Sequence, residues 1–95
     1  MNKWKFKIEI TLSPCRVRAL LDELCVSYGY CEATWSVARL AQDPPKTIDG
    51  FLDEVVRLEG IDPRACDHRN ELRAIVERYF AAEADAAKAK NIGPT

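Results

Sequence analysis

No stretch of this 95-residue sequence approaches the roughly 18 continuous apolar residues that a membrane-spanning helix needs. The lysines near the N-terminus are not followed by an apolar run, so the start of the chain does not resemble a signal peptide. A strong net charge is also lacking, because the formal charge is -1, and nothing in it favours nucleic acid or a membrane surface overall. These absences predict a cytoplasmic protein with no membrane partner, whose four cysteines are reduced thiols.

The charge that is present is distributed unevenly. Residues 1–18 hold five basic side chains against one acidic one, a local charge of +4, which leaves -5 for the remainder. The composition is 47% apolar and 31% charged, which is typical of a globular chain. The length predicts one small domain, residues 1–90, with a modest core and a disordered tail at 91–95.

Residues 3–12, KWKFKIEITL, alternate between apolar and polar side chains, which is typical of a β-strand that buries one face. No second long alternating segment follows, so the backbone N–H and C=O groups of this strand need a partner. We expect the same strand of a second copy to pair with it across a two-fold axis, which makes the protein a homodimer. Addition to another protein's sheet edge and pairing within the chain through residues 34–38 are the alternatives. The apolar side chains of the predicted dimer strand are Trp4, Phe6, Ile8, Ile10 and Leu12.

The rest of the chain predicts four helices, so the fold class is mainly α. Ser13 and Pro14 form a cap-plus-proline start for a first helix at about 14–28, and Gly29 suits its left-handed C-terminal cap. A second, shorter helix is expected at about 32–41, and paired prolines stop it. A strand is the alternative for this segment, because its apolar residues also alternate in part.

The third and fourth helices follow from further start signals and apolar stripes. Thr47 is suited to cap a helix at about 48–59, and Asp62 before a proline predicts a single turn. The fourth helix is expected at about 68–85. Its apolar stripe ends at Phe80, and the alanine-rich sequence beyond it should project from the body or fray.

Residues 5–41 place a basic strand, a proline-started helix, a glycine and a second helix in succession. The stretch IEITLSP and the helical stripe that follows it resemble the ribbon-helix-helix repressors. The resemblance implies that two strands form a ribbon that reads base edges in the DNA major groove. It also implies that the second helix, capped by Thr34, holds phosphate at its N-terminus. The contacts it implies with nucleic acid are Lys3, Lys5, Lys7, Thr11 and Thr34.

The same resemblance implies a function and a second kind of partner. Val37, Leu40 and Ala41 lie at the core spacing of the family's second helix. Some repressors of this family carry acidic C-terminal extensions that bind a toxin, and an acidic helical region follows residue 41 here. A DNA-binding regulator or antitoxin is therefore the alternative function.

Cys15 is the candidate reactive thiol. It falls in the first turn of the first predicted helix beside Arg16 and Arg18, and both the helix N-terminus and the cations favour the thiolate. A thiol-based redox protein is therefore the second alternative function. No CxxC motif or general base accompanies Cys15, so an incidental surface thiol is the competing interpretation.

Three further cysteines and the single histidine form a conceivable zinc set: Cys25, Cys31, Cys66 and His68. Structural zinc ligands come in pairs about two to four residues apart, whereas five residues separate Cys25 from Cys31. Cys25 also lies on an apolar stripe, where cysteine is ordinarily a small core residue. We predict no metal, no cofactor and no catalytic residue, and therefore a small non-enzymatic helical interaction module that homodimerises through its N-terminal strand.

Overall fold

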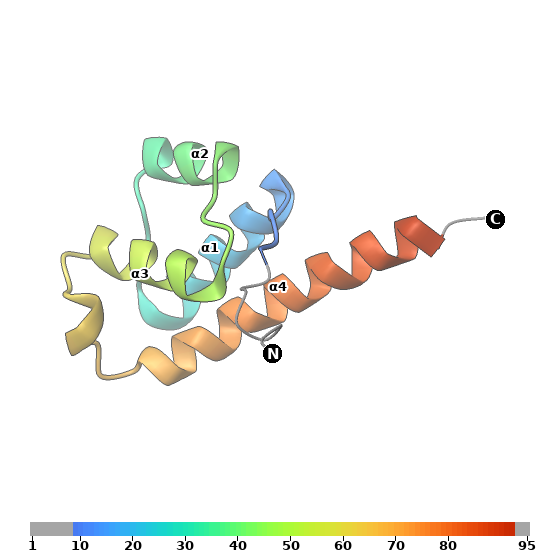
Figure 1. Ribbon diagram of the computed structural model, residues 1–95. Coiled ribbons are helices and arrows are strands. Elements are labelled where there is room, and N and C mark those ends of the chain that lie inside the picture. The colour runs from blue at the N-terminus through green and yellow to red at the C-terminus, as the bar shows by residue number, and fades with distance from the viewer. Residues whose placement is uncertain (1–8, 93–95) are drawn as a thin grey trace.

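The computed structural model describes the backbone of residues 9–92 and the side chains of residues 9–62 and 64–87. Its helices pack around one core, with α4 running across the others and extending past them (Figure 1). No residue of the described backbone belongs to a β-strand, and none of its helices is both long enough and apolar enough to cross a membrane. The elements in chain order are α1 (Pro14–Tyr28), α2 (Thr34–Gln42), α3 (Ile48–Leu58), the 3-10 helix η2 (Pro63–Ala65) and α4 (Arg69–Ile92).

The first helix has the bounds and caps that its sequence predicts. The side chain of Ser13 accepts a hydrogen bond from the Arg16 N–H at 3.3 Å, and Pro14 is the first helical residue. Gly29 adopts a φ of 75°, and its N–H donates to the Cys25 C=O at 2.9 Å. Local capping chemistry therefore suffices to define both ends of α1.

The second segment is a helix, which settles the alternative of a strand and excludes strand pairing through residues 34–38. Leu40 and Ala41 are buried from it at helical spacing, while Trp35 stays 66% exposed. The expected cap was wrong: Thr34 is the first helical residue, and Ala33 precedes it without a side-chain hydrogen bond. Burial of one face, rather than a capping side chain, holds α2 in place.

The start signals of the third helix and the single turn are confirmed. The Thr47 hydroxyl accepts from the Gly50 N–H at 3.0 Å, and the Asp62 carboxylate accepts from the Arg64 N–H at 3.0 Å. The fourth helix runs to Ile92, seven residues beyond its predicted end at 85 and into the predicted tail at 91–95. Alanine has a high helix propensity, so α4 continues after Phe80, the last buried residue among its described side chains. Glu83, beyond Phe80, still accepts a hydrogen bond from the Ser13 N–H at 2.9 Å.

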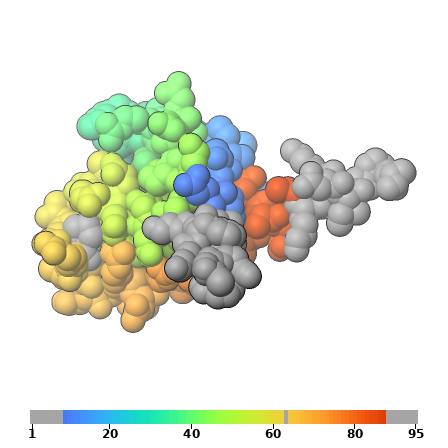
Figure 2. Space-filling model, viewed as in Figure 1, coloured from blue at the N-terminus to red at the C-terminus, as the bar shows by residue number. Residues whose placement is uncertain are grey.

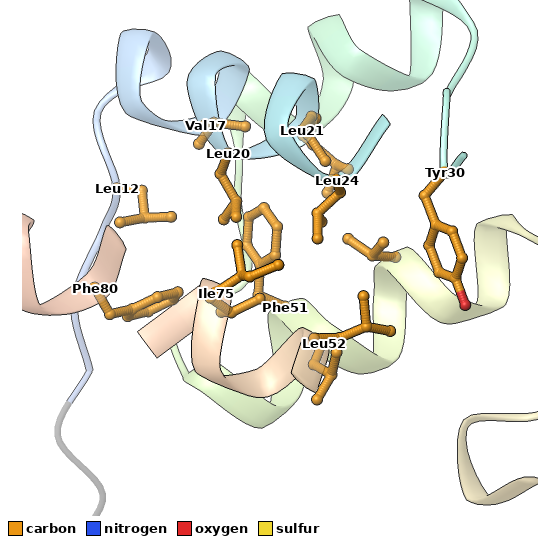
Figure 3. Close-up of a cluster of buried hydrophobic side chains, with 14 of the residues drawn as sticks. Leu12, Val17, Leu20, Leu21, Leu24, Tyr30, Phe51, Leu52, Ile75 and Phe80 are labelled. Atoms are coloured by element: carbon orange, nitrogen blue, oxygen red, sulfur yellow. The ribbon is translucent and has the colours of Figure 1, made fainter. Parts of the chain in front are cut away.

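One core joins α1, α3 and α4 (Figure 3). Phe51 of α3 and Phe80 of α4 meet edge to face, with ring centroids 6.2 Å apart. The predicted stripes supply this core, because every helix turns its three- and four-residue repeat inward. Its buried helical members include Val17, Leu20, Leu21, Leu24, Phe51, Leu52, Val55, Val56, Leu72, Ile75, Val76 and Phe80.

The described part of the predicted N-terminal strand, residues 9–12, is extended but forms no strand. Residues 3–8, with the rest of the predicted strand, lie outside the described residues. Leu12 is 1% exposed in the core of its own chain, and the Ile10 N–H donates to the Lys46 C=O at 2.9 Å. Figure 2 shows this segment in blue between the green atoms around α3 and the orange-red atoms of α4. The expected alternation is therefore present, but the core and a loop, not a second strand, contact it.

Candidate functional site

Four side chains meet where α1 ends and α4 begins, and we call them the Tyr30 cluster: Tyr28, Tyr30, Cys66 and His68. The Tyr30 hydroxyl lies 2.8 Å from His68 Nε2, within hydrogen-bonding distance. The ring of Tyr28 stacks on the imidazole, with centroids 5.3 Å apart and planes 2° apart. The Cys66 Sγ lies 4.0 Å from the Tyr30 hydroxyl. Aromatic, imidazole and thiol groups from two ends of the fold are thereby brought together.

The turn after α1 places Tyr30 in this cluster. Gly29 reverses the chain in the left-handed conformation, and the Tyr30 N–H donates to the Leu24 C=O at 3.2 Å. The ring is then 5% exposed at the edge of the core, with its hydroxyl pointing away from the labelled leucines (Figure 3). Burial, with Cys66 and Glu59 nearby, raises the pKa of Tyr30 to about 12. The phenol therefore stays protonated at neutral pH, within hydrogen-bonding distance of His68 Nε2.

The same turn corrects the expectation of four reduced thiols. Cys25 and Cys31 form a disulfide, and their Cα atoms are 4.3 Å apart. The reversal at Gly29 carries Cys31 back over the last turn of α1, so two residues six positions apart become neighbours. Cys15 and Cys66 are free thiols.

A pair of carboxyl groups lies beside the turn. Glu32 belongs to the connection between α1 and α2, and Glu59 follows the last residue of α3. Burial, a hydrogen bond to Glu59 and the charge of Glu59 raise the pKa of Glu32 to about 7. One carboxylate oxygen of Glu32 is buried without a hydrogen-bond partner. These causes favour the protonated form of Glu32, which hydrogen-bonds to Glu59.

An apolar groove of about 240 Å³ lies on another part of the molecule. The extended N-terminal segment, the start of α3 and the middle of α4 form its walls. Among the described side chains that line it, only Glu77 carries a charge. No sequence signal identified this groove, because its walls come from three distant segments. The residues that line the groove are Ile10, Ile48, Glu77, Phe80, Ala81 and Ala84.

The remaining predicted site residues are dispersed. Cys15 is exposed in the first turn of α1, where the sequence placed it. Thr11 and Thr34 are exposed on different elements. Within the described part of the chain, no three potential ligands of the His, Cys, Asp or Glu type gather as a metal site. The other candidates for the dimer strand or for DNA contact lie outside the described residues: Lys3, Trp4, Lys5, Phe6, Lys7 and Ile8.

Acidic side chains of α3 pair with basic side chains of α4. Arg69 contacts the Asp53 carboxylate at 2.8 Å, and Arg73 pairs with Asp49. These ion pairs stabilise the contact between two helices, since each carboxylate meets a guanidinium. They also leave the acidic face of α3 without the bare carboxylate cluster that a cation would need.

Replacing Tyr30 with phenylalanine should lower the free energy of unfolding by about 0.5–1.5 kcal/mol, because the ring stays buried and the hydrogen bond to His68 is lost. Tyr28→Phe is the matched control and should cost less, because Tyr28 meets the cluster with its ring. Urea denaturation followed by circular dichroism measures both. Equal losses in the two variants would contradict a stabilising role for the Tyr30 hydroxyl.

A comparison of the chain with protein-family models, with curated proteins and with solved structures found no match. The ribbon-helix-helix resemblance therefore stays a prediction. Two features of the structure carry the functional inference instead: the apolar groove and the Tyr30 cluster.

Proposed function

We propose that the protein is a small non-enzymatic helical interaction module that homodimerises through its N-terminal segment, residues 3–12. The observation that supports this is the apolar groove that opens beside Ile10. A groove with apolar walls attracts apolar side chains from another segment, because covering both surfaces removes them from water.

The alternation of residues 9–12 indicates which side chains such a segment would present. Leu12 and Ile10 turn toward the body, while Thr11 and Glu9 are exposed. In an extended chain, side chains of the same parity share one face. Ile8, Phe6 and Trp4 continue the parity of Ile10 in the sequence, so an extended conformation would give them a common apolar face.

A second copy is the partner we propose for the groove. A two-fold axis lets each copy place its Phe6 and Ile8 in the other's groove, so one pair of complementary surfaces is used twice. The lysines of the segment then remain on the opposite face, in water. Binding requires no metal, cofactor or reacting group.

Ala81→Arg should convert the dimer to a monomer, because Ala81 lines the groove and a guanidinium would fill it. Ala82→Arg is the matched control: Ala82 is its exposed neighbour on α4, outside the groove lining. We expect the first change to weaken dimerisation at least about tenfold, or about 1.4 kcal/mol. Light scattering over a concentration series measures the dissociation constants.

A wild-type chain that stays monomeric at high concentration would remove the homodimer from the proposal. The groove of such a monomer is then occupied either by the chain's own N-terminal segment or by a different partner. The fluorescence emission of Trp4 distinguishes these two cases in a Trp35→Phe background, which leaves Trp4 as the sole tryptophan. If the monomer's emission shifts in Ala81→Arg, the chain's own segment occupies the groove. If nothing shifts, the groove belongs to a different partner.

DNA binding is the alternative function, and a retention assay on duplex DNA with the same protein distinguishes it from the interaction module. A regulator of the ribbon type would be retained on duplex DNA in a salt-sensitive way, and the double change Lys5→Glu and Lys7→Glu would abolish retention. An intact dimer that fails to bind DNA at low salt supports the interaction module.

A further inference from the structure

We propose that the Cys25–Cys31 disulfide is a redox-controlled latch, whose reduction releases the connection between α1 and α2, residues 29–33, and uncovers the Cys66 thiol. This site is separate from the apolar groove and does not depend on dimerisation. The proposal rests on the contacts of the connection, the accessibility of the disulfide and the cover over Cys66.

The connection is held to the body by the disulfide, by the Tyr30 side chain and by backbone hydrogen bonds from Gly29 and Tyr30 to the end of α1. The disulfide fixes Cys31 to α1, and the adjacent Tyr30 inserts its ring at the edge of the core. Glu32 meets Glu59 beyond them. Because Tyr30 and Cys31 are neighbours in the chain, the disulfide restricts how far the Tyr30 ring can move. Reduction removes this covalent restraint and leaves only non-covalent contacts to hold the connection.

The disulfide is placed where a reductant can reach it. Cys31 is exposed and Cys25 is half-buried. Exposed disulfides are the readily reduced ones, whereas disulfides sealed inside a core resist thiol attack. The Cys25–Cys31 disulfide is therefore suited to reversible reduction and reoxidation, and not only to permanent stabilisation of the fold.

Cys66 is the group that the latch covers. It lies between η2 and α4, is half-buried and packs against the hydrophobic core. The Tyr30 hydroxyl lies 4.0 Å from its sulfur. When the connection moves, this cover leaves, and Cys66 becomes accessible without any change in its own segment.

The chemistry is a thiol–disulfide exchange with a dithiol as reductant. One thiolate of the dithiol attacks a sulfur of the pair, the S–S bond breaks, and the leaving thiolate takes up a proton. The second thiolate of the reductant then attacks the reductant's own sulfur in the mixed disulfide, the mixed S–S bond breaks, and the remaining cysteine leaves as a thiolate that takes up a proton. Two electrons pass to Cys25 and Cys31, both end as thiols, and the dithiol ends as a disulfide.

Alkylation of Cys66 by iodoacetamide, relative to Cys15, tests the latch in the full chain. Cys15 is an exposed thiol in the first turn of α1, so it is an internal reference for reagent, pH and time. The ratio of the two rates, measured by peptide mass spectrometry, should rise about tenfold when dithiothreitol reduces the disulfide, which is the behaviour of a local opening. It should fall again on reoxidation. An unchanged ratio overturns the proposal.

Two variants separate the latch from general loss of structure. Cys25→Ser with Cys31→Ser should show the high ratio with or without reductant. Tyr30→Ala should show it with the disulfide intact, because the cover itself is removed. Hydrogen exchange of the α3 amides is the second readout: a rise in the ratio with unchanged α3 protection supports the latch. If the α3 amides lost protection together with the rise in the ratio, the whole protein would be unfolding, and that result would overturn the latch.

Discussion

Phe51→Ala should lower the free energy of unfolding by about 3–5 kcal/mol, the cost of deleting a buried aromatic side chain and leaving a cavity. Phe51 is 0% exposed and meets Phe80 edge to face across the contact between α3 and α4. A single domain of this length has little spare stability, so the loss approaches the whole free energy of folding. Urea denaturation followed by circular dichroism measures the effect.

Trp35→Ala is the control for that experiment, because it deletes a larger aromatic side chain that is 66% exposed. We expect a change within about 0.5 kcal/mol for this surface position. If Phe51→Ala does not fold, Phe51→Leu gives the graded version at about 1 kcal/mol, since most of the volume is kept. Similar losses at Phe51 and Trp35 would contradict the assignment of the core.

The helices were predictable because their signals are local. Ser13, Pro14 and Gly29 define α1 through contacts within a few residues, and Thr47 does the same for the start of α3. The apolar stripes then identified the core, since helix periodicity decides which side chains face inward. Neither step needs knowledge of distant contacts.

The features that the sequence did not reveal depend on how separate segments meet. The disulfide requires the chain reversal at Gly29, and the six-residue separation of its cysteines matches no familiar spacing. The Tyr30 contact with His68 joins residues 38 positions apart, and nothing in either local sequence indicates it. The alternating N-terminal segment predicted a strand, yet its described residues meet a loop carbonyl at Lys46 and the core instead. Alternation identifies the buried face of a segment but not the kind of partner that covers it.

Raising the pH from 4.5 to 8 should destabilise the wild-type protein by about 1 kcal/mol more than the Glu32→Gln variant, with partial exposure of the site discounted. Burial and Glu59 raise the folded-state pKa of Glu32 to about 7 from its ordinary value of 4.5. Below pH 4.5 the Glu32 carboxyl group is mostly neutral in both the folded and the unfolded protein, so folding does not bury its charge. Between 4.5 and 7 the unfolded chain loses its proton first, so stability falls with rising pH and levels off above 7.

Urea denaturation midpoints across this pH range give the measurement, and the difference between the two proteins isolates Glu32 from other titrating groups. Glu9→Gln is the matched control, because Glu9 is exposed far along the chain from this pair, and its curve should parallel that of the wild type. Glu59→Gln should also flatten the dependence, since it removes the neighbouring charge and supplies an amide that donates to the ionised Glu32. Parallel wild-type and Glu32→Gln curves would mean that Glu32 ionises normally in the folded protein, and the carboxyl pair would then contribute nothing to holding the connection after α1.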